Sequence, residues 1–218
     1  MIVTNDKFIF IDNPKCASTT MRRYYSKISN KIIFQSTRNI SQCNGDFSNP
    51  NYVHTNAGGI LRYLESVKED LDDFTCFTTI RDPYERFSSH YRYFLKMNEN
   101  KLSKEELDPI RFLERRMTKA CFPINFRFCG DFEVKNLIKV ENLYEDLGRF
   151  NKMYNIGMST DSKIKLNASN RKISDFRFTD KIVDYINDNY RQDFIVGKYK
   201  MKTSKDLNGE LESLKGEK

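Results

Sequence analysis

The sequence predicts one α/β domain in which helices flank both faces of a central parallel sheet. Short apolar runs alternate with longer segments of helical periodicity, the order that right-handed βαβ units produce. The 218 residues suit a single domain of ordinary size, and 39% hydrophobic residues can fill its core. No repeat or Gly-, Ser- or Pro-rich linker divides residues 1–202, whereas the polar residues 203–218 are expected to form a flexible tail.

The first strand and the first helix are predicted close to the N-terminus. Phe8–Ile11 is a continuous apolar run, typical of a strand buried on both faces of a sheet. From residue 20 the period changes to that of a helix. The residues that share its apolar face are Met21, Tyr24, Tyr25 and Ile28. Residues 12–19 are therefore expected to form a tight loop from a strand end to a helix start.

The remaining elements follow in the same alternation. Strands are predicted at 31–34, 74–80 and 136–140, and helical periodicity covers 60–71, 84–94, 143–150 and 182–190. A capping box at Ser103–Glu106 predicts the start of another helix. In parallel sheets of this kind, ligands bind beyond the carboxyl ends of the strands.

Composition excludes several classes of protein. Five widely spaced cysteines without a CxxC pair argue against a disulfide framework and a zinc site, and two histidines argue against a His-based metal site. No segment reaches the roughly 20 apolar residues of a membrane helix, and the N-terminus lacks a signal-peptide pattern, so we expect a cytoplasmic protein. A net charge of +7 favours anionic partners.

The loop Pro14–Thr20 has the composition of an anion site. The first N–H groups of a helix lack backbone partners, and a phosphate or sulfate binds well there. Lys15 adds a full positive charge, and three hydroxyl residues follow it. The loop contains no glycine, so the Walker A pattern G-x-x-x-x-G-K-[ST] is absent. A plain strand–helix turn with a surface lysine is the alternative.

A second strand also runs into a polar turn and a helix. Arg81 follows the run 74–80, and Ser89 lies eight residues further on. An arginine fork binds a doubly charged phosphate in a bidentate manner, so this pair predicts a second phosphate site. Pairing of Arg81 with Asp82 or Glu85 is the alternative, and Arg86 is predicted to lie on the helix surface.

These two motifs resemble those of the sulfotransferases that use 3′-phosphoadenosine 5′-phosphosulfate (PAPS). The loop Pro14–Thr20 is similar to the family's P-K-x-x-[ST]-[ST] loop, and Arg81–Ser89 to its R-[DN]-P-x-x-R-x-x-S element. The resemblance is to the carbohydrate (Golgi-type) enzymes and their bacterial relatives, and it spans about residues 7–200. Further similar stretches are residues 53–57, 139–146, 166–172 and 190–199.

The resemblance implies a P-loop-NTPase-like fold and a nucleotide site. By analogy, Lys15 bonds the leaving oxygen, and Arg81 and Ser89 bind the 3′-phosphate. The residues implied to hold the phosphosulfate are Lys15, Cys16, Ala17, Ser18, Thr19 and Thr20, and those implied near the 3′-phosphate or adenine are Asn167, Ser169 and Arg171. PAPS is the implied co-substrate, and no metal is required.

The resemblance also implies a reaction, which is transfer of the sulfuryl group to a hydroxyl of a carbohydrate acceptor, a glycan or glycolipid. His54 matches the family's histidine and is the candidate general base, because imidazole takes up protons near neutral pH. Its alternatives are to cap the helix that begins near Asn56 or to orient another group. Neither a nucleic-acid partner nor a membrane span is expected. Two other functions stay open, a P-loop-type nucleotide kinase and a non-enzymatic binder of nucleotide or nucleic acid.

Overall fold

The computed structural model describes residues 1–26, 32–37, 39, 41–44, 46, 48–98, 100–114, 134–156 and 177–216. The chain falls into two compact units, where the sequence predicts one domain. Unit 1 comprises Met1–Arg81 and Ile124–Asn167, and unit 2 comprises Asp82–Pro123 and Ala168–Lys218. Each unit is therefore assembled from two separate stretches of sequence.

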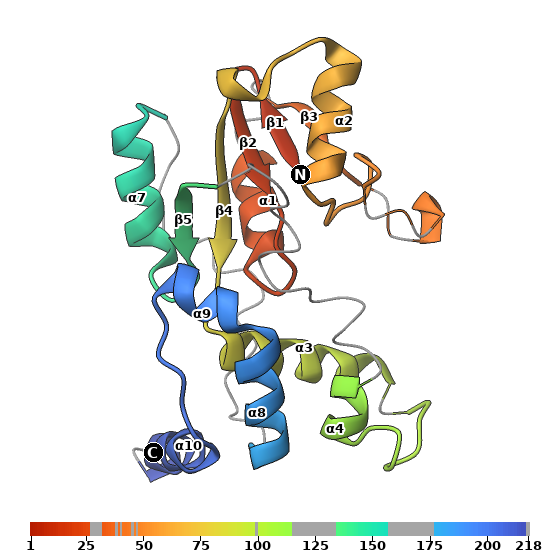
Figure 1. Cartoon of the computed structure of the whole chain (residues 1–218), viewed down its shortest axis with the longest axis vertical. Coiled ribbons are helices and arrows are strands. Elements are labelled where there is room, and N and C mark those ends of the chain that lie inside the picture. The colour runs from red at the N-terminus through yellow and green to blue at the C-terminus, as the bar shows by residue number, and fades with distance from the viewer. Residues whose placement is uncertain are drawn as a thin grey trace. The chain divides into compact units, whose positions relative to one another are not determined.

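Unit 1 is built on a mixed sheet. Its described strands are β1 (Ile2–Thr4), β2 (Phe8–Ile11), β3 (Ile32–Gln35), β4 (Thr75–Ile80) and β5 (Asn136–Lys139), in the spatial order β3-β1-β2-β4-β5. The strands β2, β4 and β5 are parallel, as predicted, whereas β1 runs antiparallel to both of its neighbours. The sheet is thus mostly, not wholly, parallel (Figure 1).

The antiparallel strand β1 is absent from the sequence-based prediction. It is joined to β2 by a tight turn in which the Lys7 N–H donates to the Thr4 carbonyl oxygen over 3.1 Å. Lys7 takes a left-handed conformation with φ of 60°. Residues 5–7 place Asn and Asp between two apolar runs, which is the composition of a hairpin turn. The turn signal was present, but β1 is only 3 residues long.

Helices cover both faces of the sheet in unit 1. The described helices are α1 (Ser18–Ser26), α2 (Ala57–Val67) and α7 (Leu143–Met153), with short 3-10 turns η2 (Ser41–Cys43) and η3 (Leu71–Asp73). Met21 and Tyr24 of α1 and Leu147 of α7 share one buried cluster with the strands. Ile60 and Leu64 of α2 belong to a second cluster. Alternate strand residues supply each cluster, because successive side chains of a strand point to opposite faces.

The register of the parallel strands decides where a ligand site can form. Ile11 at the end of β2 pairs with Thr78 of β4, and Ile80 at the end of β4 pairs with Lys139 of β5. The carboxyl ends of these three strands therefore lie at one edge of the sheet. The segments that leave this edge begin at Asp12, Arg81 and Val140.

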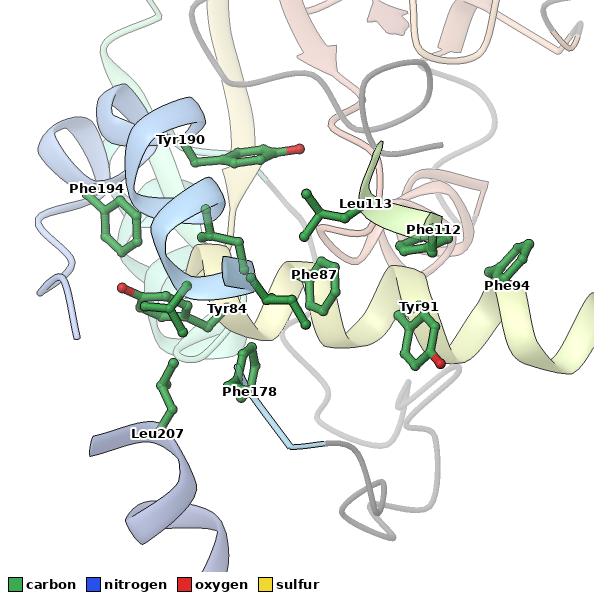
Figure 2. Packing of buried hydrophobic residues seen from close by; sticks show 13 residues of the cluster. Tyr84, Phe87, Tyr91, Phe94, Phe112, Leu113, Phe178, Tyr190, Phe194 and Leu207 are labelled. Carbon is green, nitrogen blue, oxygen red and sulfur yellow. The ribbon is translucent and has the colours of Figure 1, made fainter. Parts of the chain in front are cut away.

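Unit 2 is helical in its described part. Its helices are α3 (Pro83–Asn98), α4 (Pro109–Phe112), α8 (Asp180–Asn189), α9 (Arg191–Gly197) and α10 (Ser204–Gly216). Figure 2 shows Tyr84, Phe87, Tyr91 and Phe94 along one side of α3, within an aromatic core. The ring centroids of Tyr84 and Phe194 are 5.2 Å apart. This packing explains the helical periodicity of residues 84–94.

Two segments of unit 2 differ from the sequence-based prediction. The capping-box hydrogen bonds between Ser103 and Glu106 form, but Asp108 N-caps the next helix, α4. Pro109 is the reason, since a residue that precedes proline is held in an extended conformation and ends a helix. Residues 204–216, where a polar tail is predicted, are helical, and Leu207 of α10 is buried in the aromatic core.

Candidate functional site

The loop after β2 is fixed to the sheet by its own backbone. The Asn13 carbonyl oxygen accepts hydrogen bonds from the Cys16 N–H (3.2 Å) and from the Ser18 hydroxyl (2.9 Å). The Asn13 amide donates to the Thr79 carbonyl oxygen of β4 over 3.2 Å, and the Thr79 hydroxyl donates to the Cys16 carbonyl oxygen. The loop is therefore held from both ends and from the neighbouring strand.

Two residues of this loop have a left-handed backbone. Lys15 has φ of 63° and Ala17 has φ of 61°, a conformation that costs a residue with a side chain roughly 1–2 kcal/mol. Left-handed residues alternating with right-handed ones are typical of backbone anion sites, in which successive N–H groups point to one side. Helix α1 begins directly afterwards, and the Met21 N–H donates to the Ala17 carbonyl oxygen over 3.0 Å. The predicted order of strand, tight loop and helix is confirmed.

Burial separates the predicted loop residues into two groups. Cys16 and Thr20 are buried, so Cys16 can offer a ligand only its main chain. Lys15, Ala17 and Ser18 are half-buried, and Thr19 is exposed. A half-buried lysine at a strand end is well suited to hold an anion, because its charge is neither fully hydrated nor fully enclosed.

Asp12, the first residue after β2, contacts two basic side chains. The Nε and Nη2 atoms of Arg22, in α1, donate to Asp12 Oδ2 over 2.8 and 2.6 Å. His54 Nδ1 lies 3.0 Å from the other oxygen, Oδ1. The Asp12 side chain is completely buried, whereas that of His54 is 26% exposed. The three side chains form a charged cluster, which we call the Asp12 cluster.

The electrostatics of the cluster keep Asp12 ionised. Burial by itself would raise the pKa of the Asp12 carboxyl. The charges of His54, the Met1 amino group and Arg22, together with the His54 hydrogen bond, outweigh burial and hold this pKa well below its usual value of 3.8. The carboxylate therefore acts only as a hydrogen-bond acceptor at neutral pH.

The residues that follow His54 hold its segment against the start of helix α2. Asn56, not His54, caps helix α2, because the Asn56 side chain accepts a hydrogen bond from the Gly59 N–H. Thr55 is buried, and a Cβ atom added at Gly59 would lie 1.8 Å from its hydroxyl oxygen. Glycine at position 59 thus allows Thr55 to pack against the helix. The capping alternative for His54 is wrong.

The residues predicted for the second phosphate site lie in different units. Arg81 is the last residue of the first stretch of unit 1 and follows β4, at the same sheet edge as the β2–α1 loop. Ser89 is half-buried in α3 of unit 2. Asp82 caps α3, since its carboxylate accepts hydrogen bonds from the N–H groups of Tyr84 and Glu85. The shared site of Arg81 and Ser89 stays a prediction.

Arg86 is buried, so its predicted place on the helix surface is wrong. Its side chain is 1% exposed and donates to Asp193 of α9 over 2.9 Å. The guanidinium lies 5.8 Å from the centre of the Tyr190 ring. Two stretches of the family resemblance, which contain Arg86 and Asp193, therefore meet in a structural ion pair of unit 2.

Three predicted nucleotide contacts, Asn167, Ser169 and Arg171, lie outside the described residues. Across the described ranges, no group of three or more His, Cys, Asp and Glu residues could hold a metal ion. The helices in this part of the chain also include none that is long and apolar enough to cross a membrane. A cytoplasmic location stays a prediction from the sequence.

Sequence reasoning missed Asp12 and Arg22. Asp12 directly follows a buried strand, and the carboxyl end of such a strand is where site residues collect, so a signal existed. Arg22 lies four residues after Ser18 on the same helix, but its partners at positions 12, 36 and 53 become neighbours only in the fold.

Comparison with known proteins supports the resemblance. A model of the sulfotransferase family matches residues 1–150, which include the β2–α1 loop, His54 and Arg81. No curated protein and no solved structure matches the chain. The family match covers more than half of the 218 residues. The chain therefore belongs to the sulfotransferase family.

Proposed function

We propose that this protein transfers the sulfuryl group of PAPS to a hydroxyl of a carbohydrate acceptor, by in-line displacement. The family match supports sulfuryl transfer in general. The observation that carries the finer proposal is the β2–α1 loop, which combines a half-buried lysine, two left-handed residues and a helix start. Such a loop on a mostly parallel sheet also favours a P-loop-like architecture for unit 1.

Residues of the β2–α1 loop, Arg81 and Ser89 bind the sulfuryl donor PAPS in this proposal. The main-chain N–H groups of residues 16–20 bind the phosphosulfate, together with the hydroxyls of Ser18 and Thr19. The Lys15 ammonium group stabilises the negative charge that develops on the leaving phosphate oxygen. By the family resemblance, Arg81 and Ser89 bind the 3′-phosphate, and Asn167, Ser169 and Arg171 bind the 3′-phosphate or the adenine.

The acceptor side needs a base. As the acceptor oxygen forms its bond to sulfur, the bond from sulfur to the leaving phosphate oxygen breaks, and adenosine 3′,5′-bisphosphate departs with that electron pair. The acceptor hydroxyl loses its proton to His54. The main contributions of the protein are thus positioning of two substrates in line and stabilisation of charge, as in phosphoryl transfer. No metal has a role in this scheme.

The test is transfer of radiolabelled sulfate from PAPS to a panel of glycans. We expect transfer by the wild type and a loss of about 10²–10³-fold in kcat for Lys15→Ala, the effect of removing one preorganised group that stabilises developing charge. Lys68→Ala is the matched control, because Lys68 is exposed and also left-handed, with φ of 57°, but ends helix α2. Equal transfer by wild type and Lys15→Ala would contradict the proposal.

A further inference from the structure

Every oxygen of the Asp12 carboxylate has a defined partner in the structure. Oδ2 accepts two hydrogen bonds from Arg22, and Oδ1 faces Nδ1 of His54 at 3.0 Å. A buried carboxylate is costly unless it is paired and hydrogen-bonded, so this arrangement compensates for the burial of the charge. The sheet end, helix α1 and the segment before α2 meet at this carboxylate, and β2 and α1 are drawn side by side in Figure 1.

Arg22 fixes the carboxylate relative to the segment that carries His54. Besides its two bonds to Asp12, Arg22 donates to the Ser36 carbonyl oxygen over 2.8 Å and to the Val53 carbonyl oxygen over 3.2 Å. Val53 directly precedes His54. The Met1 amino group also donates to the Val53 carbonyl oxygen over 3.1 Å. Arg22 thus holds both the Asp12 carboxylate and the backbone carbonyl that precedes His54.

The charge of Asp12 determines which imidazole nitrogen carries the proton. Arg22 and the Met1 amino group act on the carboxylate as positive charges, and both favour its ionised form. An ionised carboxylate offers no proton, so a hydrogen bond between Oδ1 and Nδ1 requires the proton to sit on Nδ1. In a neutral imidazole, Nε2 then has the lone pair.

We propose that Asp12, clamped by Arg22, is the positioning residue for His54: it holds the proton on Nδ1 and leaves Nε2 to receive the proton of the acceptor hydroxyl. This inference rests on the proposed function, in which His54 is the general base. When Nε2 takes up that proton, the imidazolium cation is stabilised by the negative charge of Asp12. Neither Asp12 nor Arg22 belongs to the loop implied by the family motif, so the role adds residues to the site.

A purely structural role is the competing explanation, because the same bonds fasten the segment before α2 to the sheet. Arg22 has only donors, so in the Asp12→Asn variant the amide oxygen must face Arg22 and the NH₂ group must face His54. His54 Nδ1 then becomes an acceptor, and the imidazole proton moves to Nε2. This exchange follows from the hydrogen bond itself, so the tautomer tests the pairing of Asp12 with His54, and only the kinetics separate a positioning role from a structural one.

The direct test is nitrogen-15 NMR of the histidine side chains. The chain has two histidines, so the spectrum contains two imidazole spin systems, and His90→Gln assigns them. We expect neutral His54 of the wild type to carry its proton on Nδ1, and the Asp12→Asn variant to carry it on Nε2. A wild-type His54 protonated on Nε2 would overturn the inference and requires no variant to fold. An unchanged tautomer in Asp12→Asn would overturn it as well.

Kinetics supply the second readout. We expect Asp12→Asn to lower kcat by about 10²-fold, a typical contribution of a general base, with the KM for PAPS changed by less than about threefold. Asp46→Asn is the matched control, since Asp46 also pairs with an arginine, Arg62 at 2.7 Å, but its side chain is 41% exposed and accepts hydrogen bonds only from Arg62 and the Ser48 N–H among the contacts described. Equal kcat values for Asp12→Asn and Asp46→Asn would contradict the positioning role.

The two readouts separate this inference from the proposed function. If the wild type transfers no sulfate, the proposed function fails, yet the NMR spectra still decide whether Asp12 sets the tautomer of His54. If the wild type transfers sulfate and its His54 carries the proton on Nε2, the proposed reaction stands and the positioning role of Asp12 fails.

Discussion

Each unit contains an arginine–aspartate ion pair with a buried aspartate, and the two pairs differ in how far their partners are exposed to solvent. In unit 1, Asp12 is completely buried, but Arg22 and His54 keep 20% and 26% of their side chains exposed. In unit 2, Arg86 and Asp193 are 1% and 7% exposed, and the Arg86 guanidinium lies 5.8 Å from the centre of the Tyr190 ring of the aromatic core. The first pair extends through His54 toward solvent, whereas the second is enclosed.

Burial separates the motif residues that can contact a ligand from those that stabilise the fold. Arg86 and Asp193 both lie in stretches that resemble the family, yet neither reaches the surface in the structure. Asp12 lies just outside the loop motif, yet it contacts the candidate base. Burial of the whole pair, rather than membership of a motif, indicates a structural role.

The largest effect is expected from breaking the enclosed pair. Arg86→Ala leaves the Asp193 carboxylate buried without its partner, and removal of one member of such a pair costs about 3–5 kcal/mol. Hydrogen exchange of the α3 and α9 amides should therefore speed up strongly. The control is Arg177→Ala, because Arg177 is 75% exposed in its pair with Glu212 and should contribute less than about 1 kcal/mol. Equal effects of the two changes would remove the distinction between enclosed and exposed pairs.

A smaller effect should follow from crowding the segment that carries His54. Gly59→Ala introduces a methyl group where the Thr55 hydroxyl lies 1.8 Å away, and overpacking of this kind costs about 1–3 kcal/mol. Denaturant unfolding measures the loss, and the sulfate-transfer rate should fall as His54 shifts. Gly209→Ala in α10 is the opposite control, because a Cβ atom added there has no atom beyond its own helical turn within 4 Å, and helix propensity should raise stability by up to about 1 kcal/mol. An unperturbed Gly59→Ala protein would contradict the described packing.

The smallest expected effect is a dependence of stability on acid. The folded state lowers the pKa of Asp12, so its contribution to stability is complete above the usual value of 3.8 and is lost as pH falls below it. The free energy of unfolding should decrease between about pH 5 and pH 2 in the wild type and less steeply in Asp12→Asn. Unfolding curves in denaturant at several pH values measure both slopes. Identical slopes would show that Asp12 is not held in its ionised form.

Much of this fold was predictable because its signals are local. The apolar run Phe8–Ile11 and the helical periodicity after it predicted β2, the loop and α1. The antiparallel strand β1 was missed because its 3 residues are too few to give a recognisable apolar pattern, although a hairpin turn follows them. The loop itself was predicted from its lysine and hydroxyl residues, but not the left-handed conformations of Lys15 and Ala17, which no local pattern without glycine indicates.

The charged partners could not be predicted, because they are distant in sequence. Asp12 and His54 are 42 residues apart, and Arg86 and Asp193 are 107 apart. The side chain of Arg86 does not share the stripe of Tyr84, Phe87 and Tyr91 on α3, and periodicity therefore predicted an exposed arginine. A second covering helix, α9, buries it, which only the tertiary structure reveals.

By this division, the loop of unit 1 binds the nucleotide, and the enclosed pair of unit 2 stabilises the fold. Hydrogen exchange with and without adenosine 3′,5′-bisphosphate tests it most directly, because this experiment needs no knowledge of the acceptor. We predict saturable binding that slows exchange at residues 13–20 of the wild type, leaves α9 unchanged, and is weakened about 10–100-fold by Lys15→Ala, the loss expected for a hydrogen bond to a charged group. Binding that protects other segments but not residues 13–20, or that is unaffected by Lys15→Ala, would contradict the account.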